Sequence, residues 1–313
     1  MLARLQQATT LGLVLAALLW ASWFLHVGEQ AWAVFGSAMI VFGYALFLGA
    51  EFLILRAVNR NDPAPRASAA QLLCAWWGEV LTAPLVFCWR QPFRSCAIDD
   101  WLPERAMPGA GARRGVVLVH GFMCNRGIWN PWMKRLRLEG VPYVAVNLEP
   151  VFASLDAYPP CIEEAVRRVE AVTDRAPVIV AHSMGGLAVR AWLTRFGAAH
   201  RVHRVITIGT PHRGTWLGRY AFTRNGMEMR LNSTWQQELA AQELRRHGLD
   251  PHCARRYTCF YSHCDNVVFP ASTATLPGAD NRHIAGSAHV HLAFEPEVFD
   301  ETMRRIAEPD VGG

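Results

Sequence analysis

The sequence predicts an α/β domain with a doubly wound, mostly parallel sheet, preceded by an N-terminal transmembrane helical hairpin. Between residues 113 and 308, short runs of valine, isoleucine and leucine alternate with amphipathic segments, a pattern typical of strands covered by helices on both faces. Of the 313 residues, 51% are hydrophobic and only 18% are charged, against a charged share of about 25% in soluble domains. This balance indicates that part of the chain is surrounded by lipid.

The predicted hairpin occupies residues 1–60. Residues 11–25 are apolar or small except Ser22, and residues 31–55 are interrupted only by Ser37 and Glu51. Each stretch approaches the roughly 20 residues that a helix needs to cross a bilayer, and the short link at 26–30 requires an antiparallel pair. The alternative is a signal peptide cleaved near Ala-Trp-Ala at 31–33, which would still leave the second stretch as an anchor.

The charges around the hairpin predict its orientation. The link contains no lysine or arginine. Basic residues flank the hairpin on both outer sides, namely Arg4 before it and Arg56, Arg60 and Arg66 after the second apolar stretch. Both ends are therefore predicted to be cytoplasmic, with the rest of the chain on the same side. The formal net charge of +5, without any basic run longer than two residues, argues against a nucleic-acid partner. The eight cysteines form neither a CxxC pair nor a zinc-binding pattern, which favours a reducing compartment and no metal.

Residues 61–112 are predicted to be a linker that contains an amphipathic helix at 71–89. This third apolar stretch includes Glu79 and Pro84, and a charge at mid-bilayer costs about 2.5–3.5 kcal/mol. One face of the helix carries Gln71, Ala75, Glu79 and Thr82, and the opposite face carries Leu73, Trp76, Trp77 and Val80. We therefore expect a helix that lies in the membrane interface or packs on the soluble domain.

The remaining residues, 113–308, are predicted to form the α/β domain. Expected strands lie at 115–119, 143–147, 178–181, 205–208 and 257–261. Expected helices lie at 128–138, 162–172, 184–195 and 296–306. The strands are continuous apolar runs without alternation, as expected for parallel strands buried on both faces.

A serine follows the third predicted strand at a sharp turn. The sequence Ala181-His182-Ser183-Met184-Gly185 joins this strand to a helix, which is the arrangement of a nucleophile elbow. Small residues two before and two after the serine allow the close backbone approach that such a turn requires. The alternative is an ordinary strand-to-helix turn in which Ser183 only caps the helix.

Four other segments complete a recognisable pattern. His-Gly-Phe follows the first strand at 120–122, Gly-Thr-Pro-His-Arg-Gly-Thr lies at 209–215, Ser-His-Cys-Asp-Asn-Val-Val at 262–268 and Gly-Ser-Ala-His at 286–289. With the elbow, these segments resemble the bacterial lipase and esterase branch of the α/β-hydrolase family over residues 113–307. Ala181 departs from the glycine that is usual in the family, but alanine is also small.

The resemblance implies a catalytic triad in the chain order Ser, Asp, His. It implies Ser183 as nucleophile and Asp265 as the residue that orients the base, although Asp265 could also be a solvated loop residue. His289 fits the base best, with His291 and then His283 as alternatives. His182 adjoins the serine but is expected to point elsewhere. His120 and His212 are expected to shape loops through hydrogen bonds.

The family position also implies an oxyanion hole formed by the backbone N–H groups of Phe122 and Met184. An apolar insertion at about 215–251 either completes the core or forms a cap over an acyl pocket. In the second case Trp216, Met227 and Trp235 are the predicted substrate-binding residues.

These observations together predict a serine hydrolase anchored in the bacterial inner membrane by more than one crossing, with a cytoplasmic catalytic domain. It is expected to cleave lipid-like carboxylic esters through an acyl-enzyme, without metal or organic cofactor. The alternatives are an acyl-thioesterase with the same triad and a non-catalytic membrane scaffold with the same fold.

Overall fold

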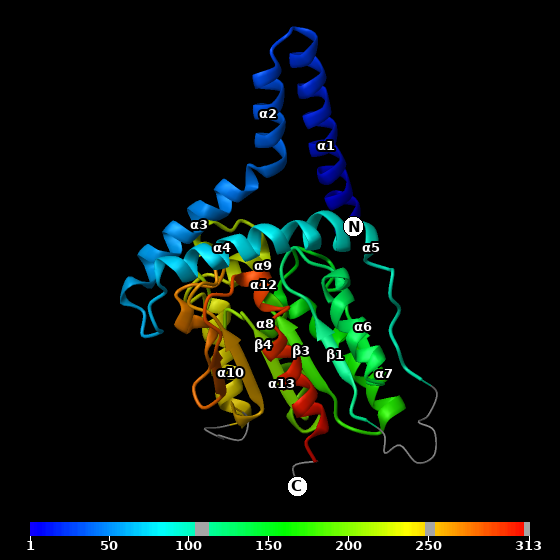
Figure 1. Cartoon of the computed structure of the whole chain (residues 1–313). Coiled ribbons are helices and arrows are strands. Elements are labelled where there is room, and N and C mark those ends of the chain that lie inside the picture. The colour runs from blue at the N-terminus through cyan, green and yellow to red at the C-terminus, as the bar shows by residue number, and fades with distance from the viewer. Residues whose placement is uncertain (104–112, 248–253, 310–313) are drawn as a thin grey trace.

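The computed structural model describes residues 1–103, 113–247 and 254–309. Its centre is a six-stranded parallel sheet in the order β2-β1-β3-β4-β5-β6 (Figure 1). The strands are β1 (Val116–Val119), β2 (Tyr143–Ala145), β3 (Val178–His182), β4 (Arg204–Ile208), β5 (Tyr257–Tyr261) and β6 (Asp280–His283). The predicted α/β fold is confirmed, and a sixth strand is added to the five predicted. Residues 104–112 of the predicted linker and 248–251 of the predicted cap lie outside the described residues.

Helices cover both faces of the sheet, because successive strand residues point into two different cores. Val117 and Val119 of β1 contribute to one core, and Val116 and Leu118 to the other. The first core is covered by α7 (Pro159–Thr173), α8 (Met184–Phe196) and α10 (Thr234–His247), and the second by α6 (Asn130–Leu138) and α13 (Pro296–Ala307). Burial on both sides explains why these strands are uninterrupted apolar runs.

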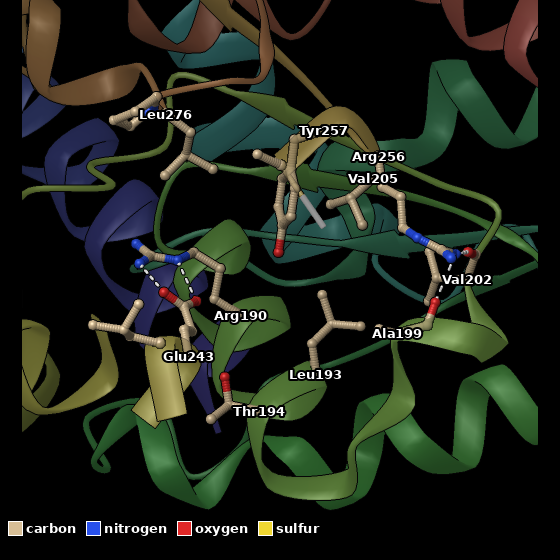
Figure 2. A pocket seen from close by; sticks show the side chains of 13 residues that line it. Arg190, Leu193, Thr194, Ala199, Val202, Val205, Glu243, Arg256, Tyr257 and Leu276 are labelled. Carbon is tan, nitrogen blue, oxygen red and sulfur yellow. Dashed lines mark hydrogen bonds and ion pairs between the residues drawn. The ribbon is translucent and has the colours of Figure 1, made fainter. Parts of the chain in front are cut away.

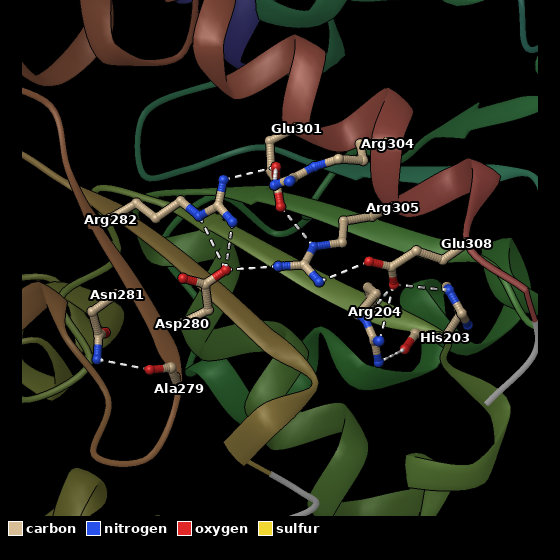
Figure 3. A network of polar contacts seen from close by, with 10 residues as sticks. All are labelled: His203, Arg204, Ala279, Asp280, Asn281, Arg282, Glu301, Arg304, Arg305 and Glu308. Atoms are coloured by element: carbon tan, nitrogen blue, oxygen red, sulfur yellow. Dashed lines mark hydrogen bonds and ion pairs between the residues drawn. The ribbon is translucent and has the colours of Figure 1, made fainter. Parts of the chain in front are cut away.

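The edge strand β6 is the strand that the sequence analysis did not predict. Its sequence, Asp-Asn-Arg-His, has no apolar run, and none of its residues is buried. Ion pairs connect it to α13: Arg305 Nη2 lies 2.6 Å from Asp280 Oδ2, and Arg282 Nη1 lies 2.7 Å from Glu301 Oε2 (Figure 3). Ion pairs with α13 thus stabilise β6 in the sheet, whereas hydrophobic burial stabilises the other strands.

The N-terminal α1 (Leu2–His26) and α2 (Gln30–Phe42) form an antiparallel hairpin that projects away from the α/β domain (Figure 1). Trp20 Nε1 donates a hydrogen bond to Trp32 O at 2.8 Å, and Ser37 Oγ donates to Ala17 O at 3.1 Å. Within the described residues, α1 and the helical segment 69–94 are each long and apolar enough to cross a membrane. The long apolar α1 fits a membrane anchor.

The second apolar stretch differs from the single helix expected of a simple hairpin. After Phe42 the chain bends by 52°, and α3 (Tyr44–Val58) continues across the end of the α/β domain (Figure 1). Glu51 supplies a physical reason, since a carboxylate is costly at mid-bilayer. On the bent helix its Oε2 instead accepts a hydrogen bond from Asn266 Nδ2 at 2.7 Å.

The helix α4 (Ala69–Pro84) packs on the α/β domain, which is one of the two placements expected for residues 71–89. It continues through a π-helical segment (Leu85–Arg90) into α5 (Gln91–Arg94). Ala75 and Glu79 are buried. Large exposed apolar side chains occupy its outer surface: Leu73, Trp77, Leu81, Leu85 and Trp89. Together α3 and α4 form a layer between the hairpin and the sheet (Figure 1).

Candidate active site

Ser183 lies at the tight turn between β3 and α8, in the strained conformation expected of a nucleophile elbow. Its φ of 54° and ψ of −129° are sparsely populated by residues other than glycine. A Cβ at Gly185 would lie 2.5 Å from His120 O, so only glycine permits this close backbone approach. The Ser183 side chain makes no capping hydrogen bond to α8, which argues against a purely structural capping role.

The structure brings Asp265 and His289 together from loops that follow β5 and β6. His289 Nδ1 lies 2.9 Å from Asp265 Oδ2, and both side chains are buried. The other carboxylate oxygen of Asp265 accepts the N–H groups of Val267 at 2.9 Å and Val268 at 2.7 Å. Because an ionised carboxylate only accepts hydrogen bonds, His289 Nδ1 carries a proton in this contact, and in the neutral form of the ring Nε2 has the free lone pair.

Burial and charge have opposite effects on the pKa of His289. Burial is the larger single influence and lowers the pKa, but the charge and hydrogen bond of Asp265, with smaller contributions from Glu79 and Glu51, together outweigh it. The pKa of His289 is therefore raised above its ordinary value of 6.5. Of the three described histidines considered as the base, His289 is the one bonded to Asp265; His291 Nδ1 lies 3.8 Å from Glu295, and His283 packs on His263.

We expected His182 to point away from the site, but in the structure it lies against His289. Its Nε2 lies 3.1 Å from His289 O, and the two rings have centroids 4.7 Å apart. Burial lowers the pKa of His182 to about 3, so the ring is neutral and donates this hydrogen bond at neutral pH. His182 thus holds His289 in place through this hydrogen bond and the contact between the two rings.

His120 and His212 shape loops, as expected. His120 Nε2 accepts the N–H of Leu148 at 3.0 Å, and its Nδ1 donates to Gly121 O at 2.9 Å. His212 Nε2 lies 3.1 Å from Thr207 Oγ1. Burial lowers the pKa of His120 to about 4, so this ring is also neutral at neutral pH.

The two residues predicted for the oxyanion hole lie beside Ser183. Met184 is the first residue of α8, where backbone N–H groups have no acceptor within the helix. Phe122 follows β1 and lines the same cavity as Ser183. Gly121, which precedes Phe122, approaches the serine so closely that a Cβ on it would lie 2.8 Å from Ser183 Cβ.

A cavity of about 600 Å³ contains Ser183 and His289. Its remaining walls come mainly from α1, α2, α3, α4 and the π-helical segment rather than from the insertion at 215–247. The N-terminal helices therefore contribute to the site as well as to the hydrophobic surface of the molecule.

Two carboxylates from these helices contact the loops that carry Asp265 and His289, and the sequence analysis did not assign them to the site. Glu79 accepts the N–H groups of Val290 at 3.1 Å and His291 at 3.1 Å. Glu51 bonds Asn266, whose Oδ1 in turn accepts the N–H of His289 at 3.2 Å. The available sequence signal was a charged residue inside an apolar helix, which often marks a functional position.

The predicted substrate-binding residues do not line this cavity. Trp216 stacks on Phe269, with ring centroids 5.9 Å apart. Trp235 is 9% exposed in the core beneath α8 and α10, and its Nε1 donates to Asp156 Oδ1 at 3.1 Å. Met227 lies on the short α9 (Arg224–Glu228) and is also absent from the cavity lining. For Trp235, completion of the core is the better description.

A separate pocket of about 240 Å³ lies at the amino ends of β4 and β5, whereas Ser183 follows the carboxyl end of β3. Figure 2 shows the side chains that line this pocket. Its charged groups pair within the protein: Arg190 Nη2 lies 2.7 Å from Glu243 Oε2, and Arg256 Nη1 donates to Ala199 O at 2.7 Å. We assign this pocket no part in the chemistry at Ser183.

Comparison with known proteins agrees with this geometry. The profile described as "Alpha/beta hydrolase family" matches residues 116–307, whereas no curated protein matches the sequence. The mature Bacillus licheniformis lipase BlEst2 is similar in structure, with 18% identity, a TM-score of 0.55, and coverage of 66% of this chain and 96% of that one. For Aspergillus fumigatus lipase B the identity is 19%, the TM-score 0.56, and the coverage 68% of this chain and 57% of that one. The family match and the shared fold show that the chain belongs to the alpha/beta hydrolase family.

Proposed function

We propose that the protein is a membrane-anchored serine hydrolase that cleaves carboxylic esters, with Ser183, His289 and Asp265 as its catalytic triad. The observation that carries the proposal is the 2.9 Å contact between His289 Nδ1 and Asp265 Oδ2, with His289 lining the same cavity as Ser183. A carboxylate in this position fixes the tautomer of the imidazole and stabilises the imidazolium that forms during the reaction.

In the proposed mechanism, Ser183 Oγ attacks the carbonyl carbon of the ester while His289 Nε2 takes the hydroxyl proton. The tetrahedral oxyanion is stabilised by the N–H groups of Phe122 and Met184, and each such donor is worth about 10²–10³-fold in rate. Collapse of the intermediate expels the alcohol, which receives the proton from His289. Water then attacks the acyl-serine by the same route and releases the carboxylic acid.

Lipid-like esters are the proposed substrates. The apolar helices around the cavity support this choice, as do structural neighbours that are lipases. We further propose that α1 and the bent pair α2–α3 hold the protein in the bacterial inner membrane with the catalytic domain at the cytoplasmic face. Arg4, Arg56, Arg60 and Arg66 support that orientation.

A fluorophosphonate probe tests the central assignment on the full chain in detergent or nanodiscs. We expect the probe to label the wild type and Ser95→Ala, whose serine lies outside the cavity, but not Ser183→Ala. Hydrolysis of p-nitrophenyl butyrate should fall by as much as ~10⁶-fold in Ser183→Ala. Labelling that persists in this variant, or a wild type that neither reacts nor hydrolyses esters, would contradict the proposal and favour a non-catalytic scaffold. Comparison of matched oxygen and sulfur esters separates an esterase from a thioesterase.

A further inference from the structure

The cavity at Ser183 extends from the α/β domain into the N-terminal helices. Its volume of about 600 Å³ lies within the usual range of small-molecule sites. Thr10, Leu13 and Val14 are among its lining residues, so the cavity extends over about 6 Å of α1, at 1.5 Å per residue. A ligand bound at Ser183 therefore has space that continues beyond the α/β domain.

The polarity of the cavity changes from one side to the other. On the side of the α/β domain it is lined by Ser183, His289 and Asn266, whose polar groups suit an ester. On the helix side most of the lining is hydrocarbon, including Leu13, Val14, Ile40, Phe42, Phe47 and Phe87. This distribution matches an amphiphile that carries its ester at one end of a long alkyl chain.

The helix side of the cavity is continuous with the outer apolar surface. The lining side chains of Leu13 and Val14 are 45% and 49% exposed, and those of Phe42 and Phe47 are 62% and 66% exposed. The same side chains therefore face both the cavity and the surroundings of the helices. In a bilayer those surroundings are lipid acyl chains, so a chain could enter without crossing water.

Hydrogen bonds at the base of α1 hold this wall against the rest of the protein. Gln6 Nε2 donates to Gln91 Oε1 at 2.8 Å, and Gln7 Nε2 donates to Pro92 O at 2.6 Å. On the other side, the bend after Phe42 leads α3 away from α1 and over the domain. Phe42 and Tyr44, on the two sides of the bend, both line the cavity.

We infer that α1, α2, α3 and the π-helical segment form the acyl-binding site, and that a long-chain ester enters it laterally from the bilayer. This inference rests on the proposed ester hydrolase activity and names its substrate class. In this arrangement the N-terminal helices, and not the insertion at 215–247, bind the acyl chain. The proposed membrane segment is then part of the substrate-binding site.

A bifunctional probe locates the acyl chain directly. The probe is an alkyl fluorophosphonate with a diazirine at the end of a tetradecyl chain, applied to the full chain in phospholipid nanodiscs and irradiated. We expect the crosslink from labelled Ser183 to fall in peptides of α1, α2 or α3. Crosslinks in 215–247 would overturn the inference, whereas a failure to label Ser183 at all would contradict the proposed function instead.

Chain-length selectivity provides a second test. Leu13→Trp and Val41→Trp add bulk at lining positions of α1 and α2. Their matched controls are Leu15→Trp and Val34→Trp, which add the same bulk at exposed positions outside the lining, 56% and 71% exposed. Two independent pairs keep the test decisive if one variant fails to fold, and labelling by a short fluorophosphonate reports an intact triad.

We expect the lining variants to lose about 10²-fold in kcat/KM for p-nitrophenyl myristate, because each methylene kept out of an apolar site costs about 4-fold. The ratio of kcat/KM for p-nitrophenyl myristate to that for p-nitrophenyl butyrate should therefore fall in the lining variants, and both controls should keep the wild-type ratio. Equal losses on the two esters, or unchanged selectivity in lining variants that label normally, would overturn the inference.

Discussion

His289 is the residue at which protonation controls the proposed reaction. Its pKa is raised above 6.5, since the effects of Asp265, Glu79 and Glu51 outweigh that of burial. Only the neutral ring can accept the serine proton, so activity is present above the raised pKa and is lost as the pH falls through it. We expect the acidic limb of kcat/KM for a butyrate ester to have its midpoint above 6.5. A midpoint at or below 6.5 would show that the carboxylates do not outweigh the effect of burial on the pKa of His289.

Substitution of Glu79, on helix α4, tests how a second carboxylate affects the pKa of His289. Its carboxylate accepts the N–H groups of Val290 and His291, and its charge also raises the pKa of His289. Burial raises the pKa of Glu79 to about 7, so its carboxylate is charged above that pH. Glu79→Gln removes this charge and leaves a single acceptor oxygen. We expect kcat to fall about 10-fold with little change in KM, and the acidic limb to move to lower pH.

Glu79→Asp separates this positioning role from simple packing. It keeps the charge on a shorter side chain, so the acidic limb should stay near its wild-type position even if kcat falls. If the limb is the same in Glu79→Gln as in the wild type, Glu79 acts only as a structural hydrogen-bond acceptor.

At the scale of elements, β6 depends on charge pairing and leads directly into the loop that carries His289. Arg305 contacts Asp280 on β6 and Glu301 on its own helix, with a side chain only 15% exposed. We expect Arg305→Ala to lower the free energy of unfolding by about 1–3 kcal/mol, because it leaves partly buried carboxylates with fewer partners. Ester hydrolysis should fall with it as the loop loses support.

Arg304 provides the matched control. It also contacts Glu301, but its side chain is 60% exposed, and exposed ion pairs contribute about 0–1 kcal/mol. Thermal unfolding in detergent should therefore place Arg304→Ala close to the wild type and Arg305→Ala clearly below it. Equal destabilisation by the two substitutions would mean that the network does not hold β6.

The same elements show what could be predicted from sequence. Five strands were predictable because each is an apolar run buried on both faces, whereas β6 has no such run. Ser183 was predictable because its turn has a local pattern. The contacts of Glu79 and Glu51 were not, since their partners Val290 and Asn266 lie 211 and 215 residues away. A contact across that separation exists only once the N-terminal helices pack on the domain.

At the scale of the whole molecule, one small core joins the N-terminal helices to the loops that carry Asp265 and His289. It combines Phe52 and Leu55 of α3 with Cys264 and Ala288. Cys264 immediately precedes Asp265, and Ala288 immediately precedes His289. The packing of α3 is therefore coupled to the positions of the proposed base and of the residue that orients it.

Leu55→Ala tests this coupling. Leu55 is 1% exposed, and removal of a buried leucine side chain costs about 2–5 kcal/mol. We expect lower thermal stability and a lower kcat on a butyrate ester, which does not need the acyl site. Leu53→Ala makes the same chemical change on the same helix at a side chain that is 72% exposed, and it should alter neither quantity. Wild-type kcat in a destabilised Leu55→Ala would mean that α3 stabilises the fold without holding the triad, and the membrane segment would then be separable from the chemistry.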